Sequence, residues 1–174
     1  RCVLEDMPVA AFKIGLLGST ENISAIAEVV SDYPEIPLVL DPVLASGRGD
    51  ELVTEEMITA LRELLIPQTT IITPNSIEAR RLVQEEGEED LDLAECAQRL
   101  LAMGCEYVLI TGTHENTAQV VNTLYGQDGV VRTYNWERLA GSYHGSGCTL
   151  ASAIAATIAN GLSISDAVKD AQEY

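Results

Sequence analysis

The chain of 174 residues carries 10 lysines and arginines against 27 aspartates and glutamates, which gives a net charge of −17. Apolar residues make up 47% of the chain and charged residues 21%, a composition typical of a single folded domain covering residues 1–174. An acidic surface repels nucleic acid and anionic lipid, so we expect neither as a partner. A phosphorylated ligand would need a locally positive pocket, built from backbone N–H groups, a metal ion or the few cations.

The cysteines give no sign of a zinc site or a disulfide framework. All four stand apart, without a CxxC pair: Cys2, Cys96, Cys105 and Cys148. We expect reduced thiols and a cytoplasmic protein, since no secretory signal opens the chain. The apolar stretch at 150–159 is too short to cross a bilayer and predicts a buried helix. Because the pattern starts abruptly at Arg1 and stops inside a predicted helix at Tyr174, we expect a piece of a longer domain.

The first half of the chain alternates between predicted strands and helices. Residues 9–17 form an apolar run broken only by Lys13 and Gly15, which predicts a strand covered on both faces. The elements predicted after it are a helix beginning near residue 19, a buried strand at 38–40, a helix beginning near residue 54 and a short strand at 70–73.

The alternation continues in the second half. A helix is predicted from residue 75, a solvated acidic loop at 85–90, a helix around 94–101 and a strand at 107–110. Residues 118–125 and 130–136 flank Gly-Gln-Asp-Gly, which indicates a hairpin. A glycine-rich loop at 141–147 then leads into a helix of small residues. This order predicts an α/β fold, with a mostly parallel sheet flanked by helices and a late antiparallel hairpin.

Polar residues follow three of the predicted parallel strands. Asp41, Thr73 and Thr111 each stand where a strand ends and a turn begins. Ligands of open parallel sheets bind outside the carboxyl ends of the strands, so we expect these residues to converge on one site.

The strongest local signal is Gly145-Ser146-Gly147-Cys148, where a loop becomes a helix. The first N–H groups of a helix lack intrahelical partners, and glycines let an anion approach them, which predicts a phosphate cradle without a lysine. Cys148 in the first turn would have a lowered pKa and would take a proton from a substrate hydroxyl. In the alternative interpretation the glycines only let the helix pack closely and Cys148 is a small buried hydrophobe.

Other polar residues admit two interpretations each. Asp41 is either a Mg²⁺ ligand or a cap for the turn at Pro42. Asn75 and Glu78 have capping-box spacing, which is structural, but the spacing also directs a carboxylate toward the expected site. His144 could touch an anionic substrate or be a hydrogen-bonded structural residue. Arg48 could close over phosphates or be a solvated loop cation.

Together these motifs resemble a known family. Leu40-Asp41-Pro42-Val43, Thr73-Pro74-Asn75 with Glu78, and His144-Gly145-Ser146-Gly147-Cys148-Thr149 occur in the order and spacing of the hydroxymethylpyrimidine and phosphomethylpyrimidine kinases of thiamine biosynthesis. These are ATP-dependent enzymes of the ribokinase-like superfamily, and the similarity runs through nearly the whole chain. Cysteine at position 148 is typical of the pyrimidine kinases, where most of the superfamily carries aspartate.

The resemblance implies a role for each of these positions. Gly145, Ser146 and Gly147 would form the anion hole, with Cys148 as catalytic base. Asp41, Asn75 and Glu78 would serve Mg²⁺ and the phosphates. Thr111, Gly112 and Thr113 would lie beside the nucleotide phosphates of ATP, and Val43 and His144 would meet a small pyrimidine alcohol or its phosphate.

Two departures from the family keep alternatives open. The family's glycine-rich amino-terminal segment is absent, and Thr111-Gly112-Thr113-His114 stands where the family often carries a lysine. A pyridoxal kinase is one alternative, because related folds phosphorylate pyridoxine-like alcohols and some carry the cysteine. The missing segment motivates another, a truncated module that binds nucleotide or phosphate without turnover. A missing sheet segment would expose an edge that a second copy of the chain can cover, so a homodimer is also possible.

Overall fold

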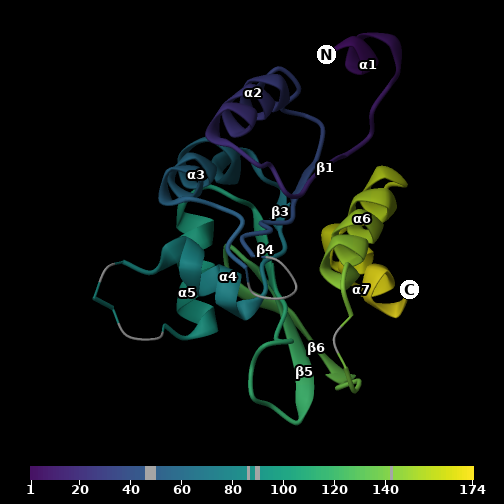
Figure 1. The fold of residues 1–174 in the computed structure, drawn as a ribbon. Helices are drawn as coiled ribbons and strands as arrows, with labels where there is room; N and C mark the ends of the chain where they lie inside the picture. Colours follow the sequence, from purple (N-terminus) through teal and green to yellow (C-terminus); the bar gives the residue numbers. More distant parts are fainter. Residues whose placement is uncertain (46–49, 86, 89–90, 142) are drawn as a thin grey trace.

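The computed structural model describes residues 1–45, 50–85, 87–88, 91–141 and 143–174 (Figure 1). Over these residues the strands form one sheet in the order β1-β2-β3-β4-β5-β6. Strands β1 to β4 are parallel, and β5 and β6 continue the sheet as an antiparallel hairpin. The strands are β1 (Phe12–Ile14), β2 (Leu38–Leu40), β3 (Ile71–Ile72), β4 (Tyr107–Ile110), β5 (Gln119–Gly126) and β6 (Gly129–Glu137). The predicted fold class is confirmed, including the late hairpin.

The helices lie on both faces of the sheet. They are α1 (Cys2–Asp6), α2 (Thr20–Ser31), α3 (Glu55–Ala60) with a π-helical turn (Leu61–Leu65) and a 3-10 turn (Ile66–Gln68) after it, α4 (Ser76–Val83), α5 (Leu93–Ala102), α6 (Ser146–Ala159) and α7 (Ile164–Glu173). Figure 1 shows α2 to α5 on one side of the strands and α6 and α7 on the other. This is the layered arrangement expected of a parallel sheet.

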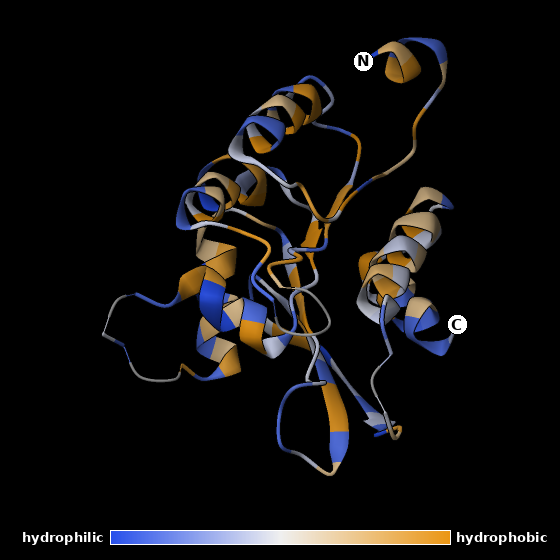
Figure 2. Cartoon of the chain, in the orientation of Figure 1, coloured by the Kyte–Doolittle hydropathy of each residue, from blue (hydrophilic) through white to orange (hydrophobic). Residues whose placement is uncertain are grey.

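Each face of the sheet has its own core, because successive side chains of a strand point to opposite faces. Leu38 and Leu40 pack with the core formed by α2 to α5, whereas Val39 packs with α6 and α7. All three are fully buried. Figure 2 shows the same pattern as apolar strands between helices that are apolar toward the sheet and polar outside.

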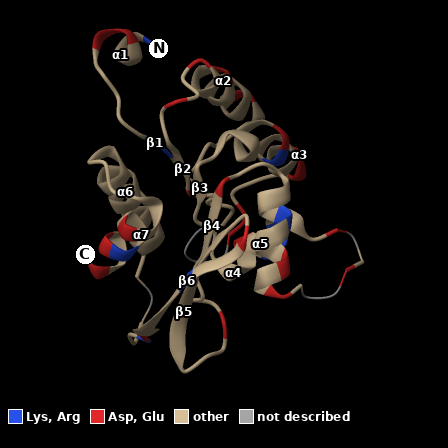
Figure 3. Cartoon of the chain, turned by 180° about the vertical axis from the view of Figure 1, so that it is seen from behind, with Lys and Arg blue, Asp and Glu red and all other residues tan. Residues whose placement is uncertain are grey.

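Most helices begin at a capping side chain that the sequence makes recognisable. Ser19, Thr54, Asn75, Asp92 and Ser163 accept hydrogen bonds from the first turns of α2, α3, α4, α5 and α7. Helix α6 instead begins at Gly145, whose φ is 86°, and no side chain caps it. Figure 3 shows the acidic residues spread over the other helices and the loops, while α6 carries no charged residue.

The first predicted strand is shorter than its apolar run. Of residues 9–17, only Phe12–Ile14 pair with β2, and the chain leaves the ladder at Gly15. The sequence pattern also missed α1, whose residues are not buried. Arg1 holds this helix to α2 through ion pairs with Glu28 and Asp32, a long-range contact without a local signal.

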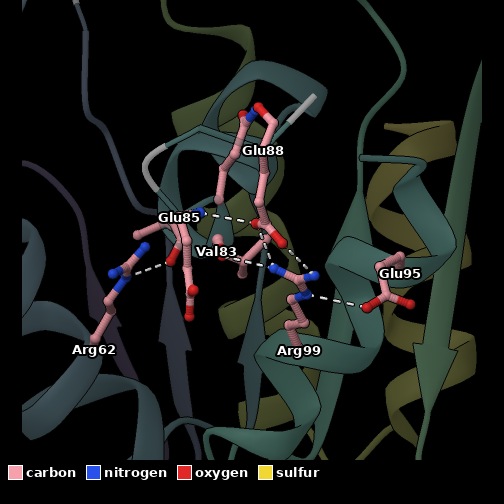
Figure 4. Close-up of polar contacts among 8 residues, drawn as sticks. Arg62, Val83, Glu85, Glu88, Glu95 and Arg99 are labelled. Atoms are coloured by element: carbon pink, nitrogen blue, oxygen red, sulfur yellow. Dashed lines mark hydrogen bonds and ion pairs between the residues drawn. The ribbon is translucent and has the colours of Figure 1, made fainter. Parts of the chain in front are cut away.

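The acidic stretch after α4 is only partly the solvated loop that its composition predicts. Figure 4 shows the Arg99 guanidinium between the carboxylates of Glu88 and Glu95. Arg99 binds Glu88 with two nitrogens, at 2.7 Å and 2.9 Å, and Glu95 at 3.0 Å. Hydrogen bonding to Arg99 lowers the pKa of Glu88 to about 2. Glu88 is therefore an anchor of this turn, and the expectation of a wholly solvated loop was wrong for it.

In the part of the chain that the structure describes, no helix is long and apolar enough to cross a membrane.

Candidate active site

The polar residues that follow the parallel strands meet at one edge of the sheet, as predicted. The backbone N–H of Asp41 donates to the carbonyl of Ile14 at 2.8 Å, and that of Thr73 donates to Leu40 at 2.9 Å. Thr111 forms a parallel bridge with Asn75 at the start of α4. The carboxyl ends of β1 to β4 thus follow one another along this edge, and α4 begins beside the end of β4.

Asp41 is a buried carboxylate with a cationic partner. Its side chain belongs to a residue only 5% exposed, and its Oδ2 lies 3.1 Å from the Nζ of Lys13. Lys13 pairs in register with Val39, and Asp41 comes two residues after Val39, so both charged groups lie on the α6 side of the sheet. Sequence reasoning did not assign Lys13 to the site, although a lone charge inside an apolar strand was the available signal.

Asn75 and Glu78 form a complete capping box. The Oδ1 of Asn75 accepts from the N–H groups of Ile77 and Glu78, and Oε2 of Glu78 accepts from the N–H of Asn75, each at 2.9 Å. The structural interpretation is therefore confirmed, and it occupies the amide oxygen of Asn75. Burial raises the pKa of Glu78 to about 7, with a further contribution from the nearby charge of Asp41. The carboxylates of Asp41 and Glu78 thus lie close enough to repel each other.

The start of α6 is open on its outer side. Gly145 adopts a left-handed conformation, and a side chain added at Gly145 or Gly147 would meet nothing within 4 Å among the described residues. Tight packing therefore does not account for these glycines, which counts against the structural alternative. An uncapped first turn with exposed backbone instead suits an approaching anion.

Cys148 lies in this first turn and is exposed. Hydrogen bonding to the Asp41 carboxylate contributes most to a raised pKa of this thiol, and desolvation by burial adds to it. Lys13 opposes the shift, and the charges of Asp41 and Glu78 add to it. The expectation that the helix start would lower this pKa was wrong, because the Asp41 carboxylate and burial of the thiol both raise it. The alternative of a buried small hydrophobe is also wrong.

The segment from Thr111 to Thr113 lies beside the same edge, but most of its backbone is already hydrogen-bonded. Thr111 donates to the carbonyl of Pro74 and accepts from the N–H of Ser76. The N–H of Gly112 donates to the Oδ1 of Asn122 at 3.1 Å. A side chain at position 112 would come within 2.3 Å of a backbone oxygen of β5, so the turn requires glycine. The N–H groups of Thr111 and Gly112 are therefore already used within the fold.

An arginine that sequence reasoning missed holds the loop after Thr111. The Arg138 guanidinium, at the end of the hairpin, donates to the carbonyls of Thr113, Glu115 and Thr117 at 2.7 Å, 2.8 Å and 3.1 Å. Because Arg138 is 21 to 25 residues away from these carbonyls, no local pattern in the sequence predicts the contact.

The remaining predicted residues lie nearby or outside the described part of the chain. Val43 is half-buried in the turn after Asp41, where its N–H donates to the Asp41 carbonyl at 2.9 Å. His144 is exposed just before Gly145. Arg48 lies outside the described residues.

The residues present would supply only some of the ligands of a Mg²⁺ ion. Asp41 and Glu78 supply carboxylate oxygens, the ligands that Mg²⁺ prefers, and a divalent cation would relieve their repulsion. Among the described residues, however, no group of three or more His, Cys, Asp or Glu side chains is arranged to hold a metal ion. Mg²⁺ would therefore keep water and phosphate oxygens as its other ligands, as it usually does at sites where phosphoryl groups are transferred.

The family model and curated relatives that match this chain are pyrimidine kinases. A family model described as phosphomethylpyrimidine kinase matches residues 1–174. The hydroxymethylpyrimidine/phosphomethylpyrimidine kinase of Streptomyces coelicolor is 36% identical over 176 residues, covering 100% of this chain and 64% of that protein.

Two solved structures show how far the likeness extends. A phosphomethylpyrimidine kinase from Clostridium difficile has a TM-score of 0.82 and 33% identity, covering 99% of this chain and 70% of the other. An ADP complex of Bacillus subtilis pyridoxal kinase has a TM-score of 0.84 and 31% identity, covering 98% and 63%. The chain spans between 35% and 66% of the length of eight curated relatives that it matches.

Proposed function

Since the chain belongs to the phosphomethylpyrimidine kinase family, we propose that it transfers the γ-phosphoryl group of ATP to hydroxymethylpyrimidine or to its phosphate ester, in the cytoplasm. The observation that carries the proposal is the uncapped, glycine-bounded start of α6 beside the Asp41 carboxylate. That arrangement combines a phosphate cradle with an acidic group for metal and proton handling, and in-line phosphoryl transfer requires both.

The roles of the chain's residues follow from their positions. The N–H groups at Gly145 to Cys148 would bind the transferring phosphoryl group, so that its charge is stabilised as the substrate oxygen attacks phosphorus and ADP leaves. Asp41 and Glu78 would hold Mg²⁺, which when bound neutralises phosphate charge. Thr111 and Thr113 would contact the nucleotide phosphates, and Val43 and His144 would line the approach of the pyrimidine.

The position of Cys148 suggests how a proton leaves the substrate hydroxyl. With its raised pKa the group is a thiol at neutral pH. A thiol is not itself a base, so Cys148 would act as a relay: its sulfur would take the proton of the attacking hydroxyl as its own proton passes toward the nearby Asp41 carboxylate.

Pyridoxal kinase activity is the second candidate, because the Bacillus subtilis pyridoxal kinase matches this chain about as well in structure. The test measures Mg²⁺-dependent ADP release with hydroxymethylpyrimidine, its phosphate and pyridoxal in parallel. We expect turnover on the pyrimidines at a kcat/KM above that on pyridoxal. A preference for pyridoxal would replace the proposed substrate.

The same assay separates a kinase from a binding module. Binding of ADP that survives Cys148→Ala, with no substrate-dependent ADP release by the wild type, would identify the chain as a module without turnover.

A further inference from the structure

Lys13 lies in strand β1, and its amine reaches the proposed site. The chain has two lysines, and the other, Lys169, lies on α7 near Glu173. Within the described part of the chain, Lys13 is the cation that pairs with a carboxylate of the proposed site. It does so from inside β1, with its side chain 23% exposed, where a charged group is costly unless it is paired.

Gly15 provides the space that the lysine needs. A methyl group added at Gly15 would lie 2.8 Å from the Nζ of Lys13, closer than non-bonded contact allows. The lysine side chain therefore runs over Gly15 to reach Asp41. The lysine, the glycine and the carboxylate therefore form one geometric unit.

The charge balance of the site explains what this unit can do. Asp41 is almost completely buried and lies near both Glu78 and the Cys148 thiol. Without Lys13, two carboxylates would face any phosphate that reached the start of α6. A cation 3.1 Å from Asp41 cancels most of that repulsion and fixes the orientation of the carboxylate.

We propose that Lys13 is a positioning residue of the active site. Its amine fixes the Asp41 carboxylate and compensates its charge so that phosphate groups can bind at the start of α6, and Gly15 leaves room for the lysine side chain. The inference deepens the proposed function and rests on it.

The test uses Lys13→Met, which keeps the length of the side chain but removes the charge, with Lys13→Arg to restore charge and Lys169→Met as the matched control. We expect kcat/KM for Mg²⁺-dependent ADP release to fall on the order of tenfold or more in Lys13→Met, to recover in part in Lys13→Arg, and to stay unchanged in Lys169→Met.

The affinity for Mg²⁺ in the absence of nucleotide, measured by calorimetry, is a second readout. A lysine with a merely structural role would not change this affinity in the same direction. Removal of a positive charge beside Asp41 should tighten Mg²⁺ binding several-fold while turnover falls. Adding Asp41→Asn to Lys13→Met should abolish the gain. Unchanged or weaker Mg²⁺ binding by a folded Lys13→Met variant would overturn the proposal.

Gly15→Ala tests the contact between Lys13 and Asp41 by narrowing the space for the lysine side chain. We expect Gly15→Ala to lower kcat/KM in the wild-type background and to have no further effect in Lys13→Met, because the methyl group acts only by displacing the amine. Equal losses in both backgrounds would overturn the role of Gly15. If the wild type itself shows no turnover, the proposed function fails, and the Mg²⁺ titrations still decide whether Lys13 compensates Asp41.

Discussion

Glu78→Gln should change how the stability of the protein depends on pH. Glutamine preserves the size of the side chain and the capping-box acceptor, so the variant removes mainly the titrating charge. Burial and Asp41 raise the pKa of Glu78 from 4.5 to about 7, so the folded state binds the proton more tightly than the unfolded state. The contribution of Glu78 to stability is therefore fully present below about pH 4.5 and is lost as pH rises through about 7.

The size of the effect follows from the two pKa values. Raising the pH from about 5.5 to about 8.5 should lower the free energy of unfolding of the wild type by roughly 2 kcal/mol more than that of Glu78→Gln. The lower limit stays above the isoelectric point of about 4.2, where the net charge no longer keeps molecules apart.

Urea unfolding of both proteins across this pH range, with a chelator present, measures the difference. Mg²⁺ should then restore part of the lost stability of the wild type at high pH, and less of it in Glu78→Gln, because a ligand of the folded state stabilises it. Parallel stability curves for the two proteins would refute the assignment of the raised pKa to Glu78.

Three further variants separate the site from the scaffold. Cys148→Ala should lower kcat by roughly two to four orders of magnitude. Because the residue is exposed, the free energy of unfolding should change by no more than about 0.5 kcal/mol. Undiminished turnover would exclude the role as a base. Gly147→Ala should leave stability unchanged or raise it by up to about 1 kcal/mol, yet reduce kcat/KM roughly tenfold or more, and full activity would argue against the phosphate cradle. Glu88→Gln should lower the melting temperature at neutral pH, because the lowered pKa of Glu88 contributes stability above about pH 4.5. The difference in melting temperature from the wild type should vanish as the pH falls through about 2. Calorimetric melting curves at both pH values check this, and a constant difference would contradict it.

The fold was predictable because its signals are local. Alternation of apolar runs with capped helices predicted the parallel sheet, and Gly126-Gln127-Asp128-Gly129 predicted the hairpin. Ser19, Thr54 and Asn75 each begin a helix near the predicted residue, because a cap and the turn that it satisfies are adjacent in the sequence.

The contacts of the site were only partly predictable, since they join distant segments. The convergence of Asp41 with the start of α4 follows from strand direction, which sequence patterns do indicate. The pairing of Lys13 with Asp41 depends on the register between β1 and β2, and the hydrogen bonds of Arg138 depend on where the hairpin ends. The raised pKa of Cys148 has the same origin: the helix that carries the thiol is local, whereas the carboxylate that determines its protonation is 107 residues away.

The central claim is tested most directly by following ³¹P NMR of the wild type with MgATP and hydroxymethylpyrimidine phosphate. A phosphoryl transfer predicts that the γ-phosphate signal of ATP disappears as ADP and a pyrophosphate ester of the pyrimidine form together, and that Cys148→Ala slows all three changes equally. Release of inorganic phosphate without the ester, or no change in the presence of bound nucleotide, would contradict the assignment of this chain as a pyrimidine kinase.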